Sequence, residues 1–157
     1  MAGYFLDTSA VAKLYHREVG SEYVERLLAA SEQNTVVSRL SLVEMESVLA
    51  TKVRTGELSV EGRELARRRL RADLAQGRLR VGPPIVERHY QNARSLLARY
   101  GVNRGLRTLD ALQLAVALDL YKAGVVSVFV AADRRLCRVA EDCDFPTVDP
   151  ADPDVIL

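Results

Sequence analysis

The stretch Val-Val-Ser-Val-Phe-Val-Ala at residues 125–131 is the strongest strand signal in the sequence. It is a continuous apolar run rich in β-branched residues, typical of a strand that is buried on both faces of a parallel sheet. Such a strand, flanked along the chain by helical segments, indicates an α/β fold. We call residues 125–131 the reference strand.

Shorter strands and longer helices alternate on both sides of it. Strands are predicted at residues 4–6 and 35–38, with brief extended pieces at 79–81 and 147–148. Ser41, Ser59 and Thr108 are assigned as N-terminal helix caps. This alternation predicts a three-layer sandwich in which helices flank a central, mostly parallel sheet. The predicted helices are 9–15, 21–30, 41–55, 59–77, 85–100, 108–124 and 133–142.

Length and composition favour one domain spanning residues 1–157. The chain has 157 residues, of which 48% are apolar, enough for a core without staples. The tail at 149–157, which contains Pro150 and Pro153, is expected to be loosely held. No secretory signal pattern is present, and no apolar stretch approaches the roughly 18 residues of a membrane helix. We therefore expect a cytoplasmic protein without a membrane partner.

The cysteine content and the charge of the chain limit the kinds of site that it can form. Cys137 and Cys143 are too few for a disulfide framework or a four-thiolate zinc site, and Cys137 is expected to be a buried apolar residue. The net charge is +1, and 19 of the 22 basic residues are arginines. Arginine suits phosphate recognition, but genomic base composition also raises its frequency, and both explanations stay open.

Four acids fall where strands lead into helices. Asp7 ends the first strand, Glu44 follows the second, Asp110 opens a helix and Asp133 follows the reference strand. Ligands of α/β sheets bind at the carboxyl ends of strands, so the topology brings these acids to one edge. Each also has a local explanation as a helix cap or first-turn acid, and Glu44 forms a capping-box pattern with Ser41. Four clustered carboxylates repel without a cation, and oxygen-only sites select Mg²⁺ or Mn²⁺.

Each acid also lies within a short motif. The motifs are Tyr-Phe-Leu-Asp-Thr-Ser at 4–9, Ser-Arg-Leu-Ser-Leu-Val-Glu at 38–44, Leu-Arg-Thr-Leu-Asp-Ala-Leu-Gln at 106–113 and Val-Ala-Ala-Asp-Arg-Arg at 130–135. In this order and spacing they resemble the motifs of PIN-domain ribonucleases, particularly the VapC-type toxins of toxin–antitoxin pairs. The resemblance implies a PIN-like fold and an endoribonuclease that depends on Mg²⁺ or Mn²⁺.

The resemblance also implies roles for individual residues. Asp7, Glu44, Asp110 and Asp133 correspond to the catalytic, metal-binding acids of the family. The first three are expected to hold the main ion, and Asp133 to bind a second ion or to position water. Supporting polar groups are expected at Thr8, Ser9 and Thr108. Implied partners are an RNA substrate, a cognate antitoxin protein and a second copy of the chain in a homodimer.

Two positions depart from the family pattern. Many relatives have Thr or Ser two residues before the fourth acid, where this chain has Ala131. Many have His three residues after the third acid, where this chain has Gln113. Both departures concern the groups that orient the acids and their water, since such groups tune a metal site without binding the ion.

The helix predicted after Ser59 carries an arginine-rich stretch. Arg63, Arg67 and Arg71 share one face of this helix, and Arg67, Arg68 and Arg71 are candidate RNA contacts. A solvated helix face is the alternative, because Glu64 and Asp73 offer partners nearby.

Three other function classes fit the sequence less well than a nuclease does. A catalytically degenerate PIN-fold binding module is disfavoured by the intact acids. An aspartate phosphoacceptor signalling domain needs a lysine at a later strand end, and none of Lys13, Lys52 and Lys122 is placed there. A haloacid-dehalogenase-like phosphatase needs Asp-x-Asp, where this chain has Ser9.

Overall fold

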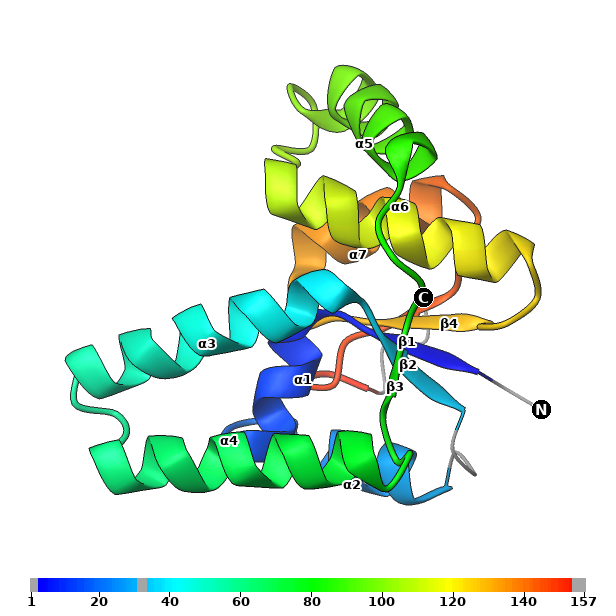
Figure 1. Ribbon diagram of the computed structural model, residues 1–157. Coiled ribbons are helices and arrows are strands. Elements are labelled where there is room, and N and C mark those ends of the chain that lie inside the picture. The colour runs from blue at the N-terminus through cyan, green and yellow to red at the C-terminus, as the bar shows by residue number, and fades with distance from the viewer. Residues whose placement is uncertain (1–2, 31–33, 154–157) are drawn as a thin grey trace.

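Five short parallel strands form the centre of the molecule. The computed structural model describes residues 3–30 and 34–153 and places helices on both sides of one sheet (Figure 1). The strands follow one another in the order β3-β2-β1-β4-β5, and every neighbouring pair is parallel. The predicted three-layer α/β sandwich is therefore confirmed. The strands are β1 (Tyr4–Leu6), β2 (Thr35–Val37), β3 (Arg80–Val81), β4 (Val128–Val130) and β5 (Thr147–Val148).

Successive side chains along each strand enter two different cores. In the paired register, Phe5 lies beside Val36 and Phe129, and these three residues face one core. The next residue of each strand faces the opposite core, as expected from the two-residue period of a strand. All three central strands are buried on both faces, which is why their sequences read as continuous apolar runs.

Each core is closed by its own layer of helices. The first core lies under α5 (Glu87–Tyr100), α6 (Thr108–Lys122) and α7 (Arg134–Asp142), seen above the sheet in Figure 1. The second is closed by α1 (Thr8–Tyr15), α2 (Ser21–Ala30), α3 (Arg39–Arg54) and α4 (Val60–Ala75). No helix in the described part of the chain is long and apolar enough to cross a membrane.

Two predicted helix caps are wrong, those of α3 and α6. The cap of α3 is Ser38, whose Oγ accepts from the Ser41 backbone N–H at 3.2 Å, so Ser41 lies inside the helix and forms no capping box with Glu44. The backbone of Ser38 is still extended, so β2 passes directly into the helix. Similarly, the extended residue before α6 is Arg107, and Thr108 is its exposed first residue.

The reference strand is shorter than predicted. Only Val128–Val130 pair as β4, because the neighbouring β1 offers three residues to pair with. The tail expected to be loose makes contacts over its described part. Pro150 is buried and its backbone lies against Gly20, while Arg134 pairs with Asp152 at 3.3 Å. The rest of the tail, 154–157, lies outside the described residues.

Candidate active site

Asp7 is held at the carboxyl end of β1. Its backbone N–H donates to the Val130 carbonyl at 2.9 Å, and its Oδ2 accepts from the Ser9 backbone N–H at 3.2 Å and from Ser9 Oγ at 2.7 Å. The carboxyl caps α1, as predicted. Burial raises its pKa from 3.8 to about 6 against the lowering effect of the Ser9 bonds, and the charges of Asp110 and Glu44 raise it further.

Glu44 is held by a buried polar network centred on Gln113. The Gln113 Nε2 atom lies 2.8 Å from Glu44 Oε1, 2.8 Å from Ser41 Oγ and 2.9 Å from Thr8 Oγ1. Thr8 Oγ1 lies 3.0 Å from Glu44 Oε1 as well. Gln113 and Ser41 are fully buried, and Thr8 nearly so. One carboxylate oxygen of Glu44 therefore faces two donors supplied by α1 and α6.

The orientation of the Gln113 amide follows from its neighbours. Its Oε1 accepts from Ser38 Oγ at 2.7 Å, while its NH₂ group faces two hydroxyls and the carboxylate. A rotated amide would set its oxygen against the Glu44 carboxylate, which has no proton to donate. Gln113, noted in the sequence as a departure, is therefore the group that fixes Glu44.

Asp110 and Asp133 are half-buried and are joined by an arginine. Arg107 lies between them, with Nε 3.2 Å from Asp110 Oδ2 and an Nη2 atom 3.6 Å from Asp133 Oδ2. Burial raises the pKa of Asp110 against the lowering effect of Arg107, and the charges of Asp133 and Glu44 raise it further. Asp133 caps α7, as predicted, by accepting from the Arg135 and Leu136 backbone N–H groups.

The four acids thus gather at the carboxyl edge of the sheet and influence one another electrostatically. Their carboxylates do not, however, surround a single position that an ion could occupy. In residues 3–30 and 34–153, no three His, Cys, Asp or Glu side chains stand close enough to hold an ion in common. The prediction that the carboxylates already converge on a shared position is therefore not met in this conformation. The donor set itself, made only of carboxylate oxygens, suits Mg²⁺ or Mn²⁺.

Ser9 connects the two parts of the cluster. Its Oγ donates to Asp7 and accepts from the Ala132 backbone N–H at 2.9 Å. It thereby ties the end of β1 to the loop that leads to Asp133. Ala131 contributes no hydroxyl here, and Ser9 supplies the polar contact to this loop instead.

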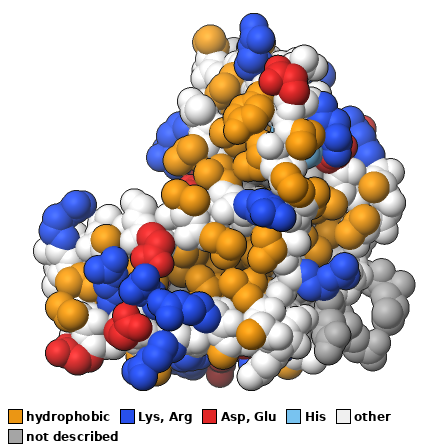
Figure 2. Space-filling model, viewed as in Figure 1, with side chains coloured by type: hydrophobic (Ala, Val, Ile, Leu, Met, Phe, Trp, Pro, Cys, Tyr) orange, Lys and Arg blue, Asp and Glu red, His pale blue; other side chains and the backbone are white. Residues whose placement is uncertain are grey.

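The arginine-rich face of α4 divides into paired and exposed residues. Arg67 Nε lies 3.0 Å from Glu46 Oε1 on α3, and its Nη1 lies 3.2 Å from Glu64 Oε2. Arg67 therefore braces α4 against α3, which weakens its case as an RNA contact. Arg68 and Arg71 are exposed. Figure 2 shows Lys and Arg side chains over α4 with acidic side chains among them.

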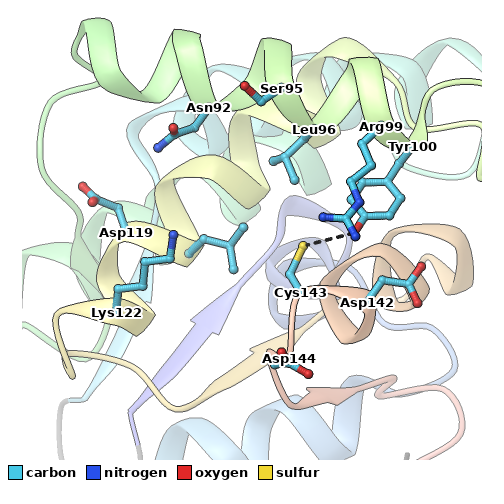
Figure 3. A pocket seen from close by; sticks show the side chains of 11 residues that line it. Asn92, Ser95, Leu96, Arg99, Tyr100, Asp119, Lys122, Asp142, Cys143 and Asp144 are labelled. Carbon is cyan, nitrogen blue, oxygen red and sulfur yellow. Dashed lines mark hydrogen bonds between the residues drawn. The ribbon is translucent and has the colours of Figure 1, made fainter.

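A pocket of about 470 Å³ lies away from the acids, between α5, the end of α6 and the end of α7 (Figure 3). Its walls include Arg99 and Tyr100 from α5 and Lys122 from α6. The Cys143 Sγ lies 3.9 Å from the Tyr100 hydroxyl at its inner side. None of the four acids lines this pocket, so it is separate from the candidate site.

Comparisons with known proteins agree with this geometry. The model of the PIN domain matches residues 4–142, a span that includes all four acids. The chain belongs to the PIN domain family. PIN domains are generally nucleases, and PIN nucleases usually use divalent metal ions.

A solved structure supports the PIN fold. The crystal structure of PAE2754 from Pyrobaculum aerophilum is similar, with a TM-score of 0.54 and 20% identity over 88% of this chain and 84% of that one. At this identity the likeness shows the fold alone. The comparison with curated proteins gave no match.

Neither the cysteines nor the lysines of this PIN domain favour a different chemistry at the site. Cys137 is buried, as predicted, and burial raises its pKa to about 12, so its thiol is inert. Lys13 and Lys52 both pair with Glu18, and Lys122 is the last residue of α6, at the opposite end from Asp110. This placement disfavours the phosphoacceptor alternative.

The sequence predicted Thr8 and Ser9 as supporting polar groups, and both contact an acid of the site. It did not predict the other positioning residues. Ser38 and Ser41 were read only as strand end and cap, and Arg107 only as part of a motif. A signal for Gln113 was available. It is a lone amide in the apolar sequence Ala-Leu-Gln-Leu-Ala at 111–115, one turn after Asp110 and on the same helix face.

Proposed function

We propose that this PIN domain is a metal-dependent endoribonuclease and the toxin of a toxin–antitoxin pair. The observation that carries the proposal is the gathering of four carboxyl groups from separate segments at one edge of the sheet. Asp7 and Asp110 both have a raised pKa, to which the other acids contribute. Such a cluster opposes folding unless a cation offsets it, which indicates a function that requires the charge.

Asp7, Glu44, Asp110 and Asp133 would hold Mg²⁺ or Mn²⁺. When bound, the metal lowers the pKa of attacking water and neutralises charge on the leaving oxygen of a phosphodiester. The chain's own contribution is orientation. Ser9 fixes the Asp7 carboxylate, and Gln113 with Thr8 fixes one oxygen of Glu44, so these acids need little rearrangement.

The proposed substrate is RNA held mainly through its backbone. Only 6% of residues are aromatic and none is Trp, so few side chains are available to stack bases. Arg68 and Arg71 are exposed candidates for phosphate contacts. The face between α3 and α6 has many apolar side chains (Figure 2) and would more readily accept protein than nucleic acid.

The proposed protein partners are a cognate antitoxin and a second copy of the chain. A groove of about 320 Å³ runs beside Glu44 and is lined by Val48 and Leu109 among others. Leu109 on α6 is 48% exposed, and Val43, next to Glu44 on α3, is 69% exposed. An apolar segment of an antitoxin seated there would lie next to a catalytic acid and could block the substrate. We place this function in the cytoplasm.

Cleavage of single-stranded RNA by the purified chain tests the proposal. We expect cleavage with Mn²⁺ or Mg²⁺, none with excess chelator, and recovery when the metal is restored. Cys137→Ser should cleave like the wild type, since this thiol is inert. RNA binding without cleavage under any divalent ion would instead support the degenerate binding module.

A further inference from the structure

One arginine lies between two of the four acids. Arg107 immediately precedes α6, and its guanidinium contacts Asp110 through Nε at 3.2 Å and Asp133 through Nη2 at 3.6 Å. Asp110 belongs to the first turn of α6, whereas Asp133 caps α7. A single side-chain cation therefore joins carboxylates from two helices at the edge where the proposed metal binds.

The contacts are suited to being broken. The Arg107 side chain is 72% exposed, and ion pairs at such exposure contribute at most about 1 kcal/mol. A divalent ion carries twice the charge and binds carboxylate oxygens directly at about 2.0–2.2 Å for Mg²⁺. A divalent ion held by Asp110 and Asp133 would therefore be a stronger competitor for these carboxylates than the guanidinium is.

We infer that Arg107 is a built-in counter-cation, which holds Asp110 and Asp133 near each other before metal binds and is displaced when it does. It is a positioning residue, and the inference rests on the proposed metal-dependent function. It also explains why the acids are gathered without being closed around one point. Two of them are turned toward a guanidinium, which is larger than a metal ion.

The chain offers a matched control in the same loop. Arg104 makes a similar forked contact, with Nε 3.0 Å from Asp142 Oδ2 and Nη2 3.3 Å from Asp142 Oδ1. Asp142 lies at the far end of α7 from Asp133 and is not one of the four acids. Arg104→Ala therefore removes a comparable surface ion pair without altering the candidate site.

The experiment measures the dissociation constant for Mn²⁺ without RNA, from the electron paramagnetic resonance signal of free Mn²⁺. Arg107→Ala should bind Mn²⁺ about tenfold more tightly than the wild type, because the ion no longer has to displace a competing cation from the carboxylates. Arg107→Lys keeps the charge but loses the planar fork, so it should bind about threefold more tightly. Arg104→Ala should match the wild type.

The measured Mn²⁺ affinities test the role of Arg107 separately from the proposed metal-dependent function. Arg107→Lys binding exactly like the wild type would show that charge alone acts, and the bridge would be rejected. Equal affinities for all four proteins would overturn the role of Arg107 and leave the metal site standing. Mn²⁺ binding by none of them would overturn the proposed function together with this inference.

Discussion

The candidate site has two halves that are built in opposite ways. The inner half consists of the buried Asp7 and the half-buried Glu44, and it is held by neutral donors from Ser9, Thr8 and Gln113. The outer half consists of Asp110 and Asp133, which are both half-buried, and it is held by the charged side chain of Arg107. Neutral donors orient a carboxylate without cancelling its charge, whereas a guanidinium cancels charge and must move.

The two halves are therefore expected to respond differently when a metal ion binds. A buried hydrogen-bond network in which every group has a partner is rigid, because breaking any bond leaves an unsatisfied group. An exposed ion pair exchanges partners at little cost. The inner half is therefore expected to keep its geometry with and without metal, and the outer half to adjust. Variants at Asp7, Gln113 and the exposed arginines of α4 test this difference.

Replacing Asp7 by Asn should have the largest effect on activity. The amide keeps the shape and the cap of α1 but loses the charge that would hold the ion. Metal-dependent RNA cleavage should fall by at least about 100-fold. Initial rates at saturating Mn²⁺ measure this, with Asp142→Asn as the control for a surface aspartate. Wild-type rates from Asp7→Asn would remove the inner half from the catalytic site.

Gln113 tests whether the inner network positions Glu44. Gln113→Glu keeps the size of the side chain but replaces its NH₂ donors with an acceptor facing Glu44, which should turn that carboxylate away. We expect Mn²⁺ affinity and cleavage to fall by about 10–100-fold. Gln113→His retains one donor and one acceptor and should lose less.

Two further measurements keep this test specific. Gln91→Glu makes the same chemical change on the exposed face of α5 and should leave both quantities unchanged. Circular dichroism at the assay temperature shows whether each variant is folded. A folded Gln113→Glu protein with wild-type Mn²⁺ affinity would mean that the network serves only the core.

The stability of the metal-free protein should reveal the buried charge of the inner half. The pKa of Asp7 is about 6 in the folded chain against 3.8 as its ordinary value, so between these values the folded state binds more protons. Its contribution to stability is complete below about pH 3.8 and is lost as pH rises through about 6. Asp7→Asn cannot ionise and should gain up to about 3 kcal/mol over the wild type by pH 7.5 in chelator.

Urea unfolding at pH 4 and pH 7.5 measures this gain, which should vanish at the lower pH. Asp110→Asn should gain less, because Asp110 is more exposed and Arg107 offsets its charge. Equal gains at the two positions would contradict the division between the halves. Saturating Mn²⁺ at a hundred times its dissociation constant should add about 2.7 kcal/mol to the wild type.

Sequence patterns predicted the parallel sheet and the clustering of acids because both depend on local signals combined with topology. Alternating apolar strands and helices determine the layers, and strand ends determine where the acids lie. The roles of Ser41, Gln113 and Arg107 depend instead on contacts between segments far apart in the chain. Gln113 and Ser41 are 72 positions apart, and no local pattern encodes their 2.8 Å contact.

The errors at helix starts have a related cause. Ser38 and Ser41 both fit the pattern of a cap, and only the length of β2 decides between them. Local spacing was also insufficient for α4. It grouped Arg67, Arg68 and Arg71, but Arg67 is paired with acids whereas Arg68 and Arg71 are exposed. Glu46 comes from α3, so its pairing with Arg67 was not predictable from the helix itself.

The smallest expected effect concerns RNA contacts on α4. Arg68 and Arg71 are exposed, so phosphates can reach them, whereas Arg67 would have to give up Glu46 and Glu64. The double variant Arg68→Ala/Arg71→Ala should therefore bind single-stranded RNA a few-fold more weakly. The slope of log affinity against log salt concentration should fall by up to about 1.4, since each lost phosphate contact removes about 0.7. Arg67→Ala should change this slope less. Fluorescence anisotropy with an RNA oligonucleotide in chelator measures binding without cleavage, and an unchanged slope in the double variant would mean that this face of α4 is only solvated.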